Sequence, residues 1–553
     1  MKRTILHILL LCCISSSAAN ISELQKQLRD VTAIKGRHSM EYALAMSKMG
    51  EYYADTLNAD YSKHKALSYF TPATNLAMEL GEGTVQCADV LLPYLKYLIC
   101  SLQYKSALPY AKSLFNIFEN AAAKLFPKMS HTEILQWLEL HKSYSDILFA
   151  ILDRNELSKA EEDMLYDMCL IEKGYLSLSQ YEPHVGMIRF ADIEQVLKPN
   201  EVAVEFASYD FGGRTFFVSS RLRHGWHHPK KQSICEHDTQ LKVAVLHKTF
   251  VNKREDIGEL IWGNLVYTFK NDEHIYFSPA GDLHLMGIEY CKIPGSRVLY
   301  MSDVYYMHRM FSTARLIVRS KANLYAPVKT AALFGSINYG DGKWPELTQT
   351  ASEVNTLERI LKESGYITEK RMQQHATARS FLDLSRKKTG IIHIATHGFT
   401  YFKFLSSDPL HGSGLVMAYG NDAFFGDTVD LISPNILTPA MIDSMNITGT
   451  RLVVLSACRS GLGIVKADNL TGLQSALCNA GAGAVMTSLW DVNDDATSVL
   501  MKEFYRNYLT TAKSFPEALR SAQQKVRKQS FAKNNTMMNG RDPKFWAAFV
   551  IYE

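Results

Sequence analysis

Two short apolar segments, each ending in a reactive side chain, constrain the fold of this chain more than any other feature. They are residues 391–398, with the sequence IIHIATHG, and residues 451–458, with the sequence RLVVLSAC. Both are rich in Ile, Val and Leu and bounded by turn residues, which is typical of buried strands in a parallel sheet. Because ligands bind at the carboxyl ends of such strands, we expect His397 and Cys458 to meet at one edge of the sheet.

His397 and Cys458 are the residue types of a cysteine nucleophile and its base. A thiol acts as a nucleophile when a base or a lowered pKa makes it a thiolate. Taken singly, each residue also has a structural interpretation, since a cysteine at a strand end is commonly a small buried hydrophobic residue and a histidine beside glycine commonly lies in a turn. Glycine and small polar residues follow both strands and would let a substrate backbone approach, which favours a catalytic dyad. On these residues alone, the structural interpretation stays open.

The residues around this pair resemble a known family. Residues 456–461, SACRSG, match in part the caspase signature, in which Q-A-C is followed by R, Q or G and then by glycine. A closer resemblance is to the CHAT domain, a caspase-like relative of separase. Its motifs occur here in the family's order: H-x-x-x-H-G from His393, L-S-A-C-x-x-G from Leu455, G-L-x-x-A from Gly472, A-G-A from Ala480, S-L-W-x-V-x-D from Ser488 and W-A-A-F-V from Trp546.

The resemblance extends toward the N-terminus. Residues 202–206, VAVEF, resemble the first strand of the CHAT region, residues 275–281, IYFSPAG, its I-x-x-S-P-x-G turn, and the L-x-x-T-x-x-E pattern from Leu347 its helix start. It therefore covers about residue 189 to the C-terminus. One departure follows Cys458: the family often has an acidic residue and a glycine before its next helix, where this chain has VKADNL at residues 465–470.

The resemblance implies an α/β caspase-like CHAT region of two sheet subdomains, the second catalytic, preceded by an all-α TPR-like region. The length of 553 residues fits about two to four domains. We expect a signal peptide at residues 1–19, TPR-like helical repeats at 20–180, an inactive caspase-like subdomain at 188–325 and the catalytic CHAT subdomain at 326–553. Residues 174–187 are expected to form a linker.

Apolar residues recur at helical spacing through the N-terminal region, which predicts helices. Residues 45–53, AMSKMGEYY, resemble the first helix of a tetratricopeptide repeat, with Gly50 for close helix packing. KALSY at residues 65–69 returns as SALPY at 106–110, a longer period than the standard one of about 34 residues. Such repeats form curved binding surfaces, so we expect a protein partner there. A non-repeating helical bundle is the alternative.

The first 19 residues have the pattern of a secretory signal peptide. A basic start and an apolar centre at residues 5–14 precede a small-residue cleavage site at 17–19. We therefore expect export to the bacterial periplasm or the extracellular space. Lipid anchoring at Cys12 or Cys13 is disfavoured, because leucine precedes Cys12 where a small residue is expected. No later apolar run reaches about 18 residues, so we expect no transmembrane segment in the mature chain.

Charge and cysteine content argue against several classes of function and site. A net charge of +4 is too small to indicate nucleic-acid binding. The chain has 9 cysteines, and the odd number left after Cys12 and Cys13 lacks the close spacing of a disulfide framework or a zinc site. His393 and His397 do not form a helix-type metal pair, because a strand separates such positions by about 13 Å rather than about 6 Å. We expect no metal and no cofactor.

The resemblance implies a cysteine peptidase. Cys458 would attack a peptide carbonyl as a thiolate, and His397 would assist its ionisation or protonate the leaving amine. The backbone N–H groups of Gly398 and Cys458 are the candidate oxyanion donors, because Gly398 has no side chain in the way. No third catalytic member is implied. His393 either supports His397 or is a hydrogen-bonded core histidine.

The loop after Trp490 carries the candidates for specificity. In separase-like enzymes an acid in the matching loop receives a basic P1 residue, the one on the acyl side of the cleaved bond. The resemblance therefore makes Asp494, and then Asp491, the S1 candidates, which would bind Arg or Lys through a charge-assisted contact. The alternative is that Asp494 or Asp495 caps the next helix.

The sequence thus predicts an exported cysteine endopeptidase that cleaves protein substrates with a Cys–His dyad, with helical repeats for a partner or substrate. Two alternatives stay open: a non-catalytic CHAT/TPR scaffold, and another cysteine hydrolase or transferase that uses the same dyad. The presence of both His397 and Cys458 favours the peptidase, since degenerate members of the family often lack one of them.

Overall fold

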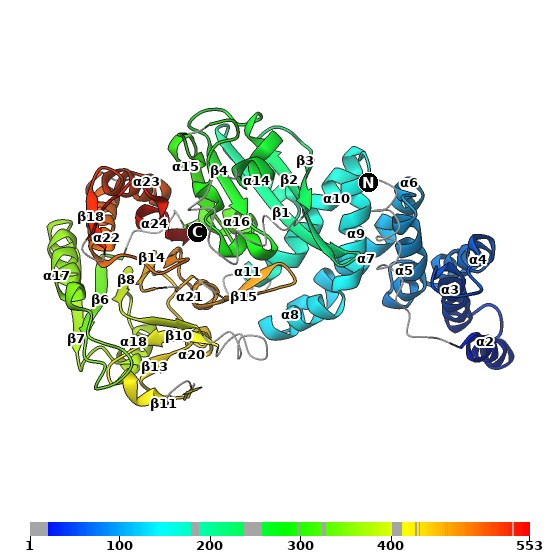
Figure 1. Cartoon of the computed structure of the whole chain (residues 1–553), viewed down its shortest axis with the longest axis horizontal. Coiled ribbons are helices and arrows are strands. Elements are labelled where there is room, and N and C mark those ends of the chain that lie inside the picture. Colours follow the sequence, from blue (N-terminus) through cyan, green and yellow to red (C-terminus); the bar gives the residue numbers. More distant parts are fainter. Residues whose placement is uncertain are drawn as a thin grey trace.

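The computed structural model places a helical N-terminal region beside an α/β region (Figure 1). It describes residues 20–178, 187–236, 257–296, 298–322, 328–400, 412–425, 428–430, 432–458, 460–461, 463–511, 513–533 and 536–553. The predicted signal peptide at 1–19 lies outside the described residues. Within them, no helix combines the length and the apolar character needed to cross a membrane.

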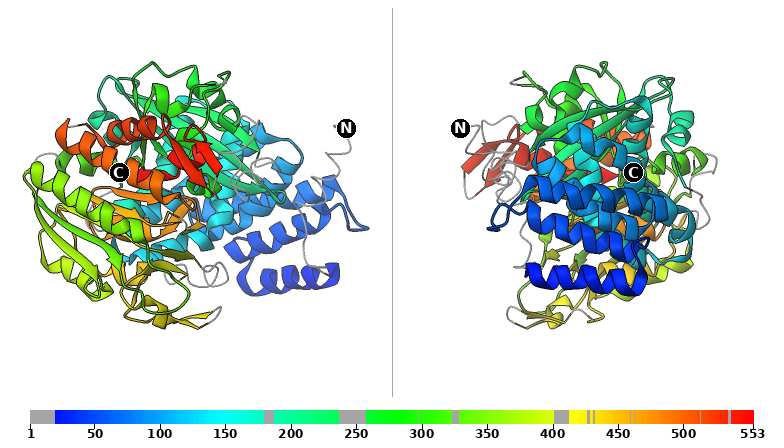
Figure 2. Two further views of the ribbon diagram at one scale, coloured as in Figure 1. Left: turned by 60° about the vertical axis from the view of Figure 1, so that its left-hand side comes forward. Right: turned by 90° about the vertical axis from the view of Figure 1, so that its right-hand side faces the viewer.

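The N-terminal region is helical, as predicted. Its longer helices are α2 (Ile21–Lys35), α3 (Met40–Ala54), α4 (Lys63–Gly81), α5 (Val85–Cys100), α7 (Ala111–Lys124), α8 (His131–Leu140), α9 (Lys142–Arg154) and α10 (Lys159–Cys169). Figure 2 shows α2 to α5 as a row of helices side by side. Gly50 allows α3 and α4 to approach closely, because a Cβ at this position would lie 2.6 Å from the Phe70 ring.

The prediction of a linker at 174–187 is wrong for residues 174–178. The chain continues from α10 through a π-helical turn (Leu170–Gly174) into α11 (Tyr175–Leu178), whose residues are largely buried. Lys173 Nζ lies 2.6 Å from Glu205 Oε2 on the sheet, and both side chains are buried. This packing keeps the segment ordered as helix, which its composition did not indicate. Residues 179–186 lie outside the described residues.

One continuous sheet of 11 strands spans the α/β region, in the order β3-β2-β1-β4-β5-β20-β17-β14-β8-β6-β7. Its first half consists of β1 (Glu201–Phe211), β2 (Arg214–Arg223), β3 (Lys230–Glu236), β4 (His274–Ser278) and β5 (Tyr306–Arg309). Its second half consists of β6 (Thr330–Ile337), β7 (Ile367–Gln373), β8 (Ile391–Ala395), β14 (Leu452–Ser456), β17 (Val485–Ser488) and β20 (Phe549–Tyr552). The halves join where Tyr552 of β20 pairs with Arg309 of β5.

The second half has the parallel core that the apolar runs predicted. β7, β6, β8, β14 and β17 are mutually parallel, and every residue of β8 and β14 is buried. Helices α17 (Thr348–Glu363), α22 (Asp494–Thr510) and α23 (Phe515–Val526) pack beside one another on this half. Burial on both faces explains why these strands read as continuous rather than alternating apolar runs.

A hairpin soon after Cys458 links the two halves of the sheet to the helical region. It is formed by β15 (Gly463–Lys466) and β16 (Asn469–Gly472), and it lies near α11 in Figure 1. At its tip, Asp468 accepts hydrogen bonds from the backbone N–H groups of Ser208 (2.7 Å) and Gly281 (2.9 Å). Asn469 Nδ2 donates to the Glu172 carbonyl at 3.0 Å. The segment 465–470, which departs from the CHAT pattern, therefore contacts both the first half of the sheet and the helical region.

Candidate active site

β8 and β14 bring His397 and Cys458 to the same sheet edge. The two strands are parallel neighbours, with Ile391 opposite Leu452 at one end and Ala395 opposite Ser456 at the other. The Thr396 N–H donates to the Ser456 carbonyl at 3.3 Å and continues this ladder. His397 and Cys458 follow two residues beyond the last pair of strand residues, so they leave the sheet at the same level.

Gly398 packs directly against the backbone of Cys458. A Cβ at residue 398 would lie 2.4 Å from the Cys458 carbonyl oxygen, a separation that a real Cβ does not adopt. Glycine is therefore required at this point by the closeness of the two segments. The glycine of the His-Gly dipeptide thus lies against the backbone of Cys458.

The His397 ring is oriented by a backbone carbonyl. Its Nε2 lies 2.8 Å from the Pro345 carbonyl oxygen, and because a carbonyl can only accept, Nε2 carries the proton. In the neutral ring, Nδ1 is then the nitrogen that accepts a proton. The rings of Tyr339 and Trp344 each lie 5.0 Å from the His397 ring, centroid to centroid.

The surroundings of His397 favour its neutral form. Burial lowers its pKa, while the hydrogen bond to Pro345 and the charge of Asp494 act in the opposite direction. The net shift is downward, so at neutral pH the imidazole is ready to take a proton.

The turn that carries Cys458 is fixed by the end of β17. The Ser488 hydroxyl donates to the Ala457 carbonyl at 2.6 Å, and the Ser488 N–H donates to Ser460 Oγ at 3.0 Å. The Gly461 N–H donates to the Ser488 carbonyl at 2.8 Å. Six cysteine side chains are described, and five of them are buried while Cys458 is half-buried. Cys458 is thus held in place on both sides and partly open to solvent.

The predicted oxyanion donor Gly398 lies at the start of β9 (Gly398–Thr400), which pairs with β10 (Ser413–Val416). The Val416 N–H donates to the His397 carbonyl at 2.9 Å, so Gly398 and Leu415 form a pair without direct hydrogen bonds. The Gly398 N–H therefore points away from β10. This orientation leaves it available to a substrate oxygen at the sheet edge.

Comparisons with known proteins agree with this architecture. The sequence model of the CHAT domain matches residues 255–553, more than half of the chain. The chain belongs to the CHAT-domain family. The predicted family and its caspase-like α/β fold are confirmed, and no curated protein matches the chain.

Solved structures similar to this CHAT protein include two cysteine peptidases. The Arg-specific cysteine proteinase gingipain R (RgpB) of Porphyromonas gingivalis has 10% identity and a TM-score of 0.33, covering 57% of this chain and 68% of that one. Separase in the Saccharomyces cerevisiae separase–securin complex has 10% identity and a TM-score of 0.44, covering 98% of this chain and 48% of that one. This chain thus spans about half of the separase chain.

His393 is a hydrogen-bonded core histidine of the CHAT sheet. Its side chain is fully buried, with Nε2 at 2.9 Å from Glu353 Oε1 and Nδ1 at 3.2 Å from the Tyr505 hydroxyl. Both contacts come from helices, α17 and α22, that cover this face. Of the two interpretations of His393, the structure supports the core one.

The capping interpretation of Asp494 and Asp495 is wrong. Asn493 is the N-cap of α22, and its side chain accepts from the Ala496 N–H at 3.0 Å. Asp494 lies one residue further on and is exposed, and its charge acts on His397. Partial burial of its carboxyl group, together with the charges of Asp495 and Glu353, raises the pKa of Asp494, while His397 opposes this shift. Asp491 is exposed in the preceding loop.

The loop after β6, residues 338–346, was not among the predicted site residues. This loop supplies Tyr339, Trp344 and the Pro345 carbonyl to the His397 ring, and it lines a pocket of about 630 Å³ together with Gln373 and Tyr419. We call this the 338–346 pocket. A usable signal was present, because β6 is a parallel neighbour of β8 and its carboxyl end had to reach the same edge.

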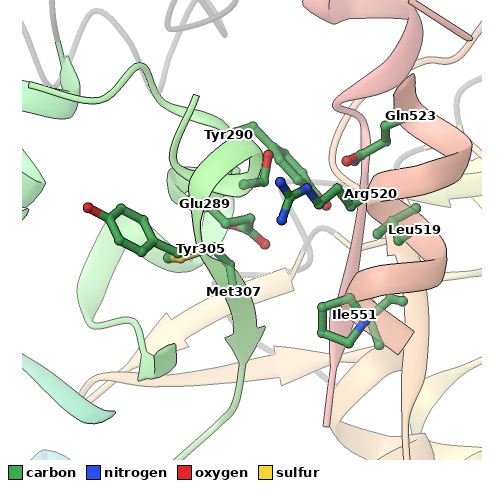
Figure 3. Close-up of a pocket in the computed structure, with 10 residues that line it drawn as sticks. Glu289, Tyr290, Tyr305, Met307, Leu519, Arg520, Gln523 and Ile551 are labelled. Atoms are coloured by element: carbon green, nitrogen blue, oxygen red, sulfur yellow. The ribbon is translucent and has the colours of Figure 1, made fainter. Parts of the chain in front are cut away.

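A second pocket lies between the two halves of the sheet (Figure 3). There, Glu289 and Tyr290 face Arg520 and Gln523 of α23. Its volume is about 20 Å³, which suits a single water molecule. This pocket is too small for a substrate side chain.

Proposed function

We propose that this CHAT protein is a cysteine endopeptidase in which Cys458 is the nucleophile and His397 the proton carrier. The observation that carries the proposal is their joint position at the ends of two adjacent parallel strands. The hydrogen bond from His397 to the Pro345 carbonyl at 2.8 Å supports it, because it leaves Nδ1 to accept a proton.

The reaction would begin when His397 Nδ1 takes the proton of the Cys458 thiol. The thiolate attacks the carbonyl carbon of the scissile peptide bond, and the N–H groups of Gly398 and Cys458 stabilise the oxyanion. His397 then gives its proton to the leaving nitrogen, the C–N bond breaks, and a thioester forms. A water molecule, deprotonated by His397, hydrolyses the thioester and restores the thiol.

Asp494 and Asp491 are proposed to favour a basic P1 residue. Both follow β17, the strand beside β14 on the side away from β8, so they lie toward the acyl half of a substrate bound to Cys458. A carboxylate there would bind Arg or Lys through a charge-assisted hydrogen bond.

The helical region is proposed to form TPR-like units that bind a protein partner or the substrate. Its surface carries large apolar side chains, including Leu57, Leu67, Leu80 and Leu102, of the kind that protein interfaces bury. We also propose that the chain is exported through its leader.

Covalent labelling tests the catalytic proposal. The mature chain, from Asn20 onward, would be treated with a peptidyl acyloxymethyl ketone, and the adduct would be located by mass spectrometry. We expect an adduct on Cys458, its loss in the His397→Ala variant, and no adduct on Cys87, a buried cysteine remote from the site. Labelling without peptide cleavage would indicate a different cysteine hydrolase or transferase, and no labelling at all would support the scaffold.

A further inference from the structure

The 338–346 pocket lies beyond His397 on the side opposite Cys458. Along the sheet, β14 is followed by β8, then β6, then β7. Cys458 follows β14, His397 follows β8, the loop follows β6, and Gln373 ends β7. The order of these groups along the carboxyl edge is therefore nucleophile, proton carrier and pocket.

The proposed reaction indicates on which side of Cys458 each half of the substrate lies. The carbonyl carbon of the scissile bond must lie at Cys458, and the nitrogen that His397 protonates belongs to the residue after that bond. The leaving half of the substrate therefore departs on the His397 side, toward the pocket. An extended chain advances about 3.3 Å per residue, and the Tyr339 and Trp344 rings lie 5.0 Å from the His397 ring. The pocket is thus within reach of the first three residues after the scissile bond.

The charges around the pocket are predominantly negative. Asp341 and Glu346 line it, and no basic residue is among its described lining residues. A third carboxylate, Asp422, reaches within 4.0 Å of where a Cβ on Gly340 would lie. The charge of Glu346 also acts on Tyr339, whose pKa burial raises to about 12.

Two basic side chains lie near the pocket without lining it. Lys343 Nζ lies over the rings of Trp344 and Phe424, 5.6 Å from each centroid. Arg371 on β7 pairs with Glu369 at 2.8 Å. The three carboxylates of Asp341, Glu346 and Asp422 therefore outnumber Lys343, whose positive charge the ring contacts do not neutralise.

An exposed aromatic ring completes the pocket. Tyr419 is 43% exposed and has a left-handed backbone, with φ of 62°. Its N–H donates to the Asn338 carbonyl at 2.9 Å, which holds it to the loop. A non-glycine residue in this conformation is strained, and such strain is found preferentially at ligand-binding positions. The Tyr419 ring offers a face on which a cation can stack.

We propose that the 338–346 pocket binds a lysine or arginine side chain from one of the first three substrate residues after the scissile bond. This inference rests on the proposed peptidase function. Asp341 and Glu346 supply the charge and Tyr419 the stacking surface. The pocket would thus set a preference on the leaving half of the substrate, separate from that of Asp494 and Asp491 on the acyl half.

Binding to an inactive variant tests the pocket independently of catalysis. The full mature chain with Cys458→Ala would be titrated with two fluorescent hexapeptides, Ala-Lys-Ala-Lys-Ala-Ala and Ala-Glu-Ala-Glu-Ala-Ala. We expect at least tenfold tighter binding of the lysine peptide. Adding Asp341→Asn and Glu346→Gln should lower that preference at least fivefold, and Glu346→Lys should lower it as well, while the preference that Asp494 and Asp491 confer remains. The matched control, Asp383→Asn with Glu363→Gln at a half-buried and an exposed site, should change binding less than twofold.

Two outcomes would overturn the inference: equal binding of the two peptides, or an unchanged lysine preference in the pocket variant. A kinetic arm separates this failure from that of the peptidase proposal. The pocket variant should lose at least tenfold in kcat/KM on substrates with lysine after the scissile bond. Its Ki for a peptidyl aldehyde, which carries only a hydrogen atom on that side of the carbonyl, should change less than twofold. If Cys458 is never labelled, the peptidase proposal fails while the binding result still decides whether the pocket recognises a basic side chain.

Discussion

His397 donates a hydrogen bond from Nε2 to the Pro345 carbonyl oxygen at 2.8 Å. This contact links two loops that follow neighbouring strands. It leaves Nδ1 as the ring nitrogen that can accept a proton. In the proposed peptidase, this backbone contact would orient the imidazole in place of a third catalytic side chain.

Gly398→Ala should abolish turnover while the fold is retained. The new Cβ would lie 2.4 Å from the Cys458 carbonyl oxygen, so the two catalytic segments must separate. We expect a loss of at least about 100-fold in kcat/KM, as misplacement by about 1 Å can cause. Peptide cleavage and circular dichroism would measure the two effects. Gly36→Ala is the control, because Gly36 has a left-handed φ of 79° but open space around it; a similar loss in both variants would count against the account.

Activity should persist below the ordinary pKa of histidine. Burial lowers the pKa of His397 from 6.5, so the neutral base remains populated as the pH falls, and the acid limb of kcat/KM should lie below pH 6.5. Asp494 acts to raise this pKa, so Asp494→Asn should move the acid limb to lower pH. Asp495→Asn serves as the control in the same helical turn. A shift of the limb to higher pH in Asp494→Asn would refute the assignment.

Lys173→Met should strongly destabilise the junction between the helical region and the sheet. Lys173 Nζ is buried and lies 2.6 Å from Glu205 Oε2 and 2.7 Å from Ser278 Oγ. Removing it leaves Glu205 as an unpaired buried charge, which costs about 3–5 kcal/mol. Urea unfolding would measure the loss. Adding Glu205→Gln should recover part of it, and Lys387→Met, which breaks an exposed pair with Glu369, should have little effect.

Glu172 should make stability depend on pH near neutrality. Burial and the charge of Asp468 raise its pKa from 4.5 to about 7, against the effect of Lys142. The folded chain therefore holds a proton that the unfolded chain releases above pH 4.5, so this stabilisation is lost as the pH rises through about 7. The Tm of Glu172→Gln relative to wild type should be higher at pH 8 than at pH 5. Glu23→Gln, on the exposed helix α2, should show no such difference.

Much of the fold could be predicted because apolar patterns within single strands and helices determine it. The apolar runs ending at His397 and Cys458 are adjacent parallel strands, since burial on both faces requires apolar residues throughout. The helices of the N-terminal region follow from their apolar spacing. The pairing of His393 with Glu353 and Tyr505 was one of two interpretations that the strand pattern allowed.

The remaining features depend on contacts that sequence patterns do not encode. The Pro345 carbonyl is a backbone group and leaves no signature. The conformation of its loop depends on Asn421, whose side chain accepts from the Trp344 N–H at 2.8 Å and donates to the Gly340 carbonyl at 2.8 Å. The helix at Tyr175–Leu178 is set by burial against the sheet. The cap of α22 differs from the expected one by a single residue, because Asn493 is as good a cap as aspartate.

Digestion of a defined peptide library by the mature chain and by its Cys458→Ala variant decides whether Cys458 is the nucleophile of a peptidase. We predict that the first protein cleaves peptide bonds and that the second does not, with basic residues enriched on both sides of the cut. Cleavage that persists in Cys458→Ala, or a mature chain that is labelled at Cys458 but cleaves no peptide bond, would contradict this prediction.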